Sequence, residues 1–302
     1  MVGSNLPGRG GEFNGDEVRP ARRYSVAGPA APLFVCELGD GPPVVVLHGG
    51  PGASHDYLLP SFGCLADEFR LCFYDQRGGG RSPVDRPSAI GWRDHVADLE
   101  ALRIEWGLER LALAGYSWGG LLALLYATEY PDRVRALALV APAAGWGDYQ
   151  RRFKEEFERR NRSAAVQHLR AELESSDLRE RDPAAYWQRR FDLSVAGYFR
   201  DPGQACGVTP FVVQARTQDA TWRSLKGHGP RLRRKLRSLR VPTLVLHGRY
   251  DPIPLEWVEE LCEVMPDAQL VALEGSGHLP YFDEPDRTFE ELRNFFRKEA
   301  AS

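Results

Sequence analysis

Short apolar runs alternate with stretches of helical spacing along most of this chain. Periodic apolar positions predict helices over residues 95–106, 121–130 and 255–265. Strands that alternate with helices favour a mostly parallel sheet covered by helices on both faces. The six apolar runs that predict the strands are residues 43–47, 70–74, 111–114, 134–140, 241–247 and 269–273.

The pattern divides the chain into a core and an insertion. Residues 21–144 and 240–302 carry the alternation, which begins with a predicted hairpin over residues 23–38. Residues 145–239 break it: they are heavily charged, with helical spacing in several places, and predict a helical cap inserted after the strand at 134–140. Such a cap would lie over the strand ends, exclude water and shape a pocket. Residues 1–20 are rich in Gly and charge, and we expect them to be disordered.

Ser117 lies in the most informative motif, Gly115-Tyr-Ser-Trp-Gly119, between a predicted strand and a predicted helix. Such a tight turn lifts the serine hydroxyl above the sheet edge in a strained backbone conformation, and glycines flank it where side chains would clash. The motif on its own is weak, because Gly and Ser are common. Its context makes Ser117 a candidate nucleophile.

A second motif, His48-Gly-Gly-Pro-Gly52, follows the predicted strand at 43–47. Backbone N–H groups in such a loop can be aimed at a developing oxyanion. We assign that role to the N–H groups of Gly50 and of Trp118, the residue after the candidate nucleophile. His48 is an alternative catalytic base, although a structural hydrogen-bonding role is the favoured interpretation.

Asp251 and His278 complete a candidate catalytic triad. Asp251 lies in the loop after the strand at 241–247, and His278 lies in a glycine-flanked loop after the strand at 269–273. Known catalytic triads include some whose nucleophile, acid and base follow one another along the chain in this order, Ser, Asp, His. All three follow predicted strands, so the parallel sheet would bring them to one edge.

Composition narrows the range of partners, cellular locations and cofactors to be expected. The formal net charge of −3 gives no argument for binding nucleic acid or a membrane surface, and leucines at helical spacing make the basic run at 231–240 a solvated helix face. Five scattered cysteines suggest reduced thiols and a cytoplasmic location, and neither a signal peptide nor a membrane span is expected. The histidines lack metal-ligand spacing, so neither metal nor cofactor is expected.

Four motifs together resemble the proline iminopeptidase branch of the α/β-hydrolases. They are His48-Gly-Gly-Pro-Gly52, Gly115-Tyr-Ser-Trp-Gly-Gly120, Gly248-Arg-Tyr-Asp251 and Asp75-Gln-Arg-Gly-Gly-Gly-Arg-Ser82. The favoured interpretation of the last motif is a charge network that holds its loop beside the active site. The resemblance covers roughly residues 44–296 apart from the cap. It implies an α/β-hydrolase fold and a cap-covered serine peptidase that releases an N-terminal residue, often proline.

In that branch, cap carboxylates hold the substrate's ammonium group. The cap contains many acids, and none matches the family pattern clearly. Asp219 is the candidate, with Trp222 nearby, and Tyr57 could line the pocket or simply pack. The other acids noted in the cap are Glu155, Glu156, Glu158, Glu172 and Asp192.

The sequence therefore predicts a serine hydrolase that acts through an acyl-enzyme, with a small molecule or short peptide as its partner. The first hypothesis is an aminopeptidase. A carboxylesterase or lactonase is the nearest alternative, and a non-catalytic ligand receptor on the same fold is the alternative of another class. The oligomeric state stays open.

Overall fold

An eight-stranded, mostly parallel sheet lies at the centre of the structure, a computed structural model that describes residues 21–301. The strand order is β1-β2-β4-β3-β5-β6-β7-β8; β2 pairs antiparallel with β1 and β4, and all other pairs are parallel. The predicted disorder of residues 1–20 concerns residues outside the described range. The strands are β1 (Arg22–Ala27), β2 (Pro32–Leu38), β3 (Pro43–Leu47), β4 (Arg70–Tyr74), β5 (Leu111–Tyr116), β6 (Val134–Val140), β7 (Thr243–Gly248) and β8 (Ala268–Leu273).

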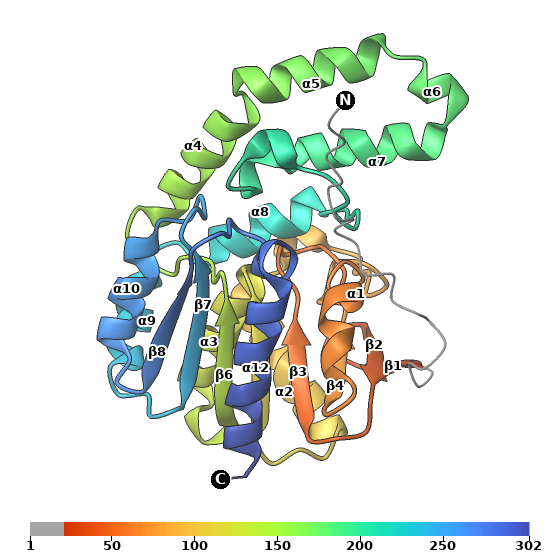
Figure 1. The fold of residues 1–302 in the computed structure, drawn as a ribbon. Helices are drawn as coiled ribbons and strands as arrows, with labels where there is room; N and C mark the ends of the chain where they lie inside the picture. Colours follow the sequence, from red (N-terminus) through yellow and green to blue (C-terminus); the bar gives the residue numbers. More distant parts are fainter. Residues whose placement is uncertain (1–20, 302) are drawn as a thin grey trace.

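Helices cover both faces of the sheet, as the alternating pattern predicts (Figure 1). Alternate residues of a strand point to opposite faces, so Val45 packs in one core with α2, α3, α9 and α10, and Val46 packs in the other with α1 and α12. This doubly wound arrangement confirms the predicted fold class. The helices of the two layers are α1 (Leu59–Phe62), α2 (Trp92–Glu105), α3 (Trp118–Glu129), α9 (Gly229–Leu236), α10 (Leu255–Val264), α11 (Pro280–Asp283) and α12 (Pro285–Ala300).

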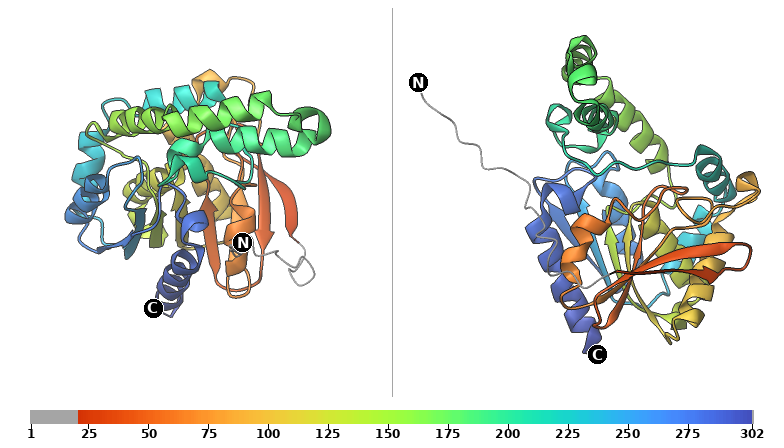
Figure 2. Two further views of the ribbon diagram at one scale, coloured as in Figure 1. Left: turned by 45° about the horizontal axis from the view of Figure 1, so that its top comes forward. Right: turned by 90° about the vertical axis from the view of Figure 1, so that its right-hand side faces the viewer.

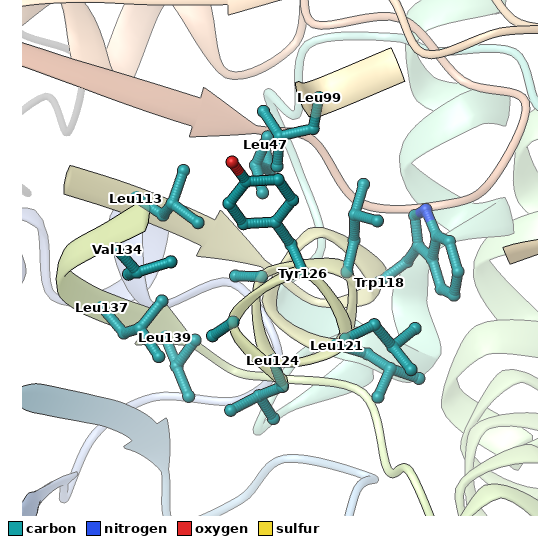
Figure 3. Packing of buried hydrophobic residues seen from close by; sticks show 14 of the residues in the cluster. Leu47, Leu99, Leu113, Trp118, Leu121, Leu124, Tyr126, Val134, Leu137 and Leu139 are labelled. Carbon is teal, nitrogen blue, oxygen red and sulfur yellow. The ribbon is translucent and has the colours of Figure 1, made fainter. Parts of the chain in front are cut away.

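The α3 helix is the most deeply buried helix of the sheet layers. All its residues from Trp118 to Thr128 are buried. Its side chains pack on every side, with Tyr126 directed toward Leu47 and Leu99 (Figure 3). A helix that is apolar all round is held on all sides, so the turn at its N-terminus has a rigid support.

Between β6 and β7 the chain forms helices that lie above the carboxyl ends of the strands (Figures 1 and 2). This is the segment for which the sequence predicts a cap; the exact boundaries 145 and 239 stay a prediction. Leu173, Tyr186 and Leu193 form a small apolar cluster within it, and Val166, Val195 and Phe199 join the core on the α1 and α12 side of the sheet. The helices above the sheet are α4 (Tyr149–Asn161), α5 (Ala164–Ser175), α6 (Leu178–Arg181), α7 (Pro183–Ser194) and α8 (Ala215–Ser224).

Helix boundaries differ from the spacing-based predictions by a few residues. The α3 helix begins at Trp118, three residues before the predicted start at 121, because the Ser117 turn leads directly into it. The α2 helix likewise begins at Trp92, where the side chain of Asp94 accepts a hydrogen bond from the Gly91 N–H. Within residues 21–301, no helix combines the length and apolar character needed to cross a membrane.

Candidate active site

Ser117 lies at the sharp turn between β5 and α3. Its φ of +52° and ψ of −117° are strained for a residue with a side chain. The turn needs both flanking glycines: a Cβ on Gly115 would lie 2.4 Å from the Gly119 carbonyl oxygen, and one on Gly119 would lie 2.1 Å from the Leu47 carbonyl oxygen. Strand and helix therefore touch here as the motif predicts, and the serine side chain stays partly exposed.

The structure brings the three predicted triad residues together. His278 Nε2 lies 3.1 Å from Ser117 Oγ, and His278 Nδ1 lies 2.8 Å from Asp251 Oδ2. Asp251 is itself held by the Ile253 N–H, which donates to Oδ1 at 2.6 Å. With Asp251 ionised, Nδ1 of His278 carries the proton and Nε2 is left to accept one from the serine. This arrangement can activate a nucleophile.

The two backbone N–H groups assigned as oxyanion donors, those of Gly50 and Trp118, are unused among the described residues. Within residues 21–301, neither Gly50 N nor Trp118 N donates a backbone hydrogen bond; Trp118 is the first residue of α3, where such N–H groups are unsatisfied. The neighbouring Gly49 N–H is already used, since it donates to the Tyr57 hydroxyl at 2.7 Å. Gly50 has a φ of +60°, which suits glycine. Both N–H groups are therefore available, and their role as oxyanion donors stays a prediction.

The contacts of His48 indicate a structural role. Its Nδ1 donates to the Gly49 carbonyl oxygen at 2.9 Å, its Nε2 accepts from the Gln76 N–H at 3.1 Å, and burial lowers the pKa of the ring to about 4. Gln76 also donates to the His48 carbonyl oxygen and accepts from Trp118 Nε1 at 2.7 Å. Both ring nitrogens of His48 are thus engaged, one within its own loop and one with Gln76, whose side chain contacts Trp118 of α3. This supports the favoured interpretation over a role as base.

Asp75 anchors the loop that follows β4. Its buried carboxylate accepts from His55 Nδ1 at 2.7 Å and from Arg81 Nε at 2.9 Å. Burial acts to raise the pKa of Asp75, but the hydrogen bonds from His55 and Arg81 outweigh it and hold the pKa well below its usual range. Two residues on, Arg77 forms a buried ion pair with Asp98 of α2. The charge network predicted for this loop is present.

Aromatic rings surround His278. The ring centroids of Tyr116, Phe153 and Tyr198 lie 5.4, 5.7 and 4.9 Å from that of His278. Phe153 belongs to α4, and Tyr198 follows α7, so the inserted segment supplies two of these rings. On the side of the oxyanion loop, the Phe211 ring lies 4.8 Å from that of Tyr57. The walls beside Ser117 and His278 are therefore aromatic and uncharged at these positions.

Comparison with known proteins agrees with this geometry. The family model described as "alpha/beta hydrolase fold" matches residues 42–285. The chain belongs to this family. It is therefore a hydrolase of the α/β fold. Membership of the family does not by itself specify which bond is cleaved.

Similar proteins of this hydrolase family carry two kinds of name. A proline iminopeptidase of Xylella fastidiosa strain 9a5c is 30% identical over 80% of this chain and 85% of its own length, and one of Saccharolobus solfataricus is 26% identical over 83% and 84%. Among solved structures, a thermophilic esterase from Thermogutta terrifontis has a TM-score of 0.63 and 25% identity, covering 92% of this chain and 99% of its own.

Five of the acids noted in the segment between β6 and β7 are engaged with neighbouring groups. Asp192 is buried and accepts from the backbone N–H groups of Gly207 and Val208, each at 3.0 Å. Of the other four, Glu155 pairs with Arg151, and Glu156 with both Arg159 and Arg160. Glu158 pairs with Arg162, and Glu172 with His168. None of these five is left as a free carboxylate facing His278.

The predicted substrate-binding residues lie in three different environments. Asp219 is exposed on α8, whose buried Thr217 and Thr221 face Gly78 and His95, so the structure does not bring Asp219 to the triad. Trp222 packs against Trp118 with ring centroids 5.5 Å apart. Tyr57 supports the oxyanion loop through its hydroxyl. Its role there follows from a contact eight residues away that no sequence motif marks.

The described residues contain no group of three or more His, Cys, Asp or Glu side chains placed to hold a metal ion. The chemistry available at the site is that of its side chains and backbone N–H groups: a hydroxyl, an imidazole oriented by a carboxylate, and two adjacent donors.

Proposed function

We propose that this chain is a serine hydrolase that cleaves carboxylic esters or amides through an acyl-enzyme on Ser117. The observation that carries the proposal is the continuous contact from Ser117 Oγ through His278 to Asp251, at 3.1 and 2.8 Å. A hydroxyl becomes an effective nucleophile when an adjacent base takes its proton and a third group orients that base.

In the proposed mechanism, His278 Nε2 takes the proton of Ser117 as Oγ attacks the substrate carbonyl carbon. The carbonyl oxygen becomes an oxyanion, which accepts hydrogen bonds from Gly50 N–H and Trp118 N–H. His278 then protonates the leaving alcohol or amine as its bond to the carbonyl carbon breaks. Water, deprotonated by His278, attacks the acyl-enzyme and releases the acid. Asp251 stabilises the imidazolium in both halves.

Two substrate classes have support from different observations. The curated relatives are named proline iminopeptidases, which favours release of an N-terminal residue from a peptide or amide. The geometry favours a neutral acyl group, because aromatic rings surround His278 and the five engaged cap carboxylates offer no partner for an ammonium group. An unpaired buried ammonium would be costly. We therefore propose a carboxylesterase or lactonase on small acyl substrates as the function that the site supports best, with the aminopeptidase as the second candidate.

The first test compares proline β-naphthylamide with p-nitrophenyl butyrate, using wild type and Ser117→Ala. We expect hydrolysis of the butyrate, with kcat in Ser117→Ala lower by on the order of 10⁴-fold or more. Full activity in the variant would contradict the role of Ser117.

Turnover of the amide substrate, proline β-naphthylamide, distinguishes an aminopeptidase from an esterase. Cleavage of proline β-naphthylamide that disappears when the proline nitrogen is acetylated would establish the aminopeptidase and a cationic substrate end. Labelling of Ser117 by a fluorophosphonate without turnover of any ester or amide would favour the receptor alternative.

A further inference from the structure

A second groove, apart from the catalytic serine, lies between α3, α8, α9, α10 and the segment that joins β6 to α4. Its volume is about 1040 Å³, and neither Ser117 nor His278 lines it. Two lining residues connect it with the proposed catalytic residues: Trp222 packs on Trp118, and the Leu121 N–H donates to the Ser117 carbonyl oxygen at 3.3 Å. Ligand sites in proteins commonly measure roughly 300–1,000 Å³, so this groove has room for a small molecule.

The groove is strongly cationic in a chain whose net charge is −3. Its two acids are both engaged: Glu260 accepts from Arg233 at 2.8 Å and from the Tyr149 hydroxyl at 3.1 Å, and Asp148 pairs with Arg151. The remaining cations form no ion pair with any residue in the described range. These four are Arg223, Lys226, Arg234 and Arg237.

The α9 helix explains why these charges gather on one side. It buries Leu232 and Leu236 in the core that surrounds α3. Arg234 and Arg237 are three residues apart and so lie on one helix face. Lys235, between them, is occupied elsewhere, since its Nζ donates to Glu129 and to the Thr128 carbonyl oxygen, both at 2.9 Å. The basic run at 231–240 is thus divided between a paired lysine and a groove-lining pair of arginines.

Aromatic side chains form the rest of the wall. Trp146, Tyr149 and Trp222 are half-buried there. Trp146 is held edge-on against Trp257, with ring centroids 4.4 Å apart, and within residues 21–301 its buried Nε1 has no hydrogen-bond partner. Buried donors are rarely left unpaired in proteins, so this N–H is a polar group still without a partner among the described residues.

We infer that this groove binds a phosphate ester of an aromatic or heteroaromatic group. Guanidinium groups match phosphate oxygens in geometry as well as charge, and the excess of cations suits a ligand with more than one negative charge. The indole and phenol rings offer a stacking surface for the planar part. This site is independent of the acyl chemistry at Ser117 and does not require it.

The test is isothermal titration calorimetry on the full chain with phenyl phosphate and with ADP as probes. The groove variant is Arg234→Glu/Arg237→Glu. Its matched control is Arg231→Glu/Arg240→Glu, which makes the same charge change on exposed arginines of the same basic run that do not line the groove. Thermal melting of both variants verifies that they fold.

We expect saturable binding of at least one probe, weakened tenfold or more in the groove variant and less than twofold in the control. Adenosine without phosphate should bind at least tenfold more weakly than ADP. Absence of saturable binding of both probes at concentrations up to about 1 mM would overturn the inference. Equal weakening in the groove variant and the control would also overturn it, because the attraction would then come from surface charge in general.

Discussion

The backbone N–H of His278 donates a hydrogen bond to the Tyr198 carbonyl oxygen at 2.8 Å. The loop that carries the proposed base is therefore fixed by the segment inserted between β6 and β7, in addition to its own sheet. The contact is close: a Cβ on the preceding Gly277 would lie 2.1 Å from that same oxygen and 3.0 Å from Arg200 N. The position of the imidazole thus depends on how the insertion is seated.

Gly277→Ala tests this dependence. The added methyl group meets backbone atoms, which cannot rotate away, so the His278 loop and the Tyr198 segment must separate. We expect kcat on the best ester substrate to fall at least tenfold, because small misplacement of a base has a large effect on rate. Steady-state kinetics at saturating substrate measures it.

Gly275→Ala is the control for that substitution. It lies in the same loop, but the nearest atom to its Cβ is the flexible end of Glu284 at 3.1 Å. We expect a kcat within twofold of wild type. A similar loss of activity in both variants would show that the loop is generally intolerant and that the Tyr198 contact is not the cause.

Tyr57→Phe removes the acceptor of the Gly49 N–H. A buried donor left without a partner costs about 1–3 kcal/mol, so the free energy of unfolding should fall by that order, measured by urea denaturation. Because Gly49 precedes the proposed oxyanion donor, kcat should fall as well. Tyr74→Phe is the matched control, since the buried Tyr74 hydroxyl has no hydrogen-bond partner within residues 21–301. A destabilisation of Tyr74→Phe equal to that of Tyr57→Phe would contradict the assignment.

The buried Arg77–Asp98 pair allows a double-mutant test of the loop after β4. Asp98→Asn leaves the buried Arg77 guanidinium with the partly exposed Asp94 carboxylate, 3.3 Å away, as its remaining counter-charge. We expect a loss of about 3 kcal/mol in the free energy of unfolding, the lower end of the range for a broken buried pair. Arg77→Met/Asp98→Leu removes both charges and should lose less than Asp98→Asn alone. If the double variant were the less stable of the two in urea, the pair would be contributing more than charge compensation.

The raised pKa of Asp283 predicts that the free energy of unfolding depends on pH. Burial raises its pKa from 3.8 to about 6, against the hydrogen bond from the Gly277 N–H at 2.7 Å. An acid whose pKa is raised in the folded state binds its proton more tightly there, so stability falls as pH rises from about 4 to about 6. Asp283→Asn keeps an acceptor for Gly277 but cannot ionise.

Urea denaturation at pH 4, 5, 6 and 7 checks this. Relative to wild type, Asp283→Asn should become progressively more stable as pH rises through that window, whatever the constant offset caused by the substitution. A difference between the two proteins that stays the same at all four pH values would rule out this role of Asp283.

Local sequence was sufficient for the turn at Ser117 and for the order of the sheet elements that carry Asp251 and His278. Gly115 meets the Gly119 carbonyl oxygen, a contact that lies within the motif itself, whereas the contact of Gly119 with the Leu47 carbonyl oxygen needs the neighbouring strand β3. The start of α3 was harder to predict, because Trp118 belongs to the turn motif and to the helix at once. Helical spacing predicted helices within residues 145–239 but not which of their side chains face the serine.

The sequence by itself determined the family, the strand-and-loop positions of the candidate catalytic groups and the cationic character of residues 231–240. Tertiary structure alone decided that the Tyr57 hydroxyl accepts from the Gly49 N–H, that Asp219 is exposed on α8, and that five other acids of the inserted segment are engaged with neighbouring groups. The physical reason is the separation along the chain between the groups that interact. Backbone turns depend on adjacent residues, whereas the partner of a buried hydroxyl or carboxylate depends on which distant segment packs beside it.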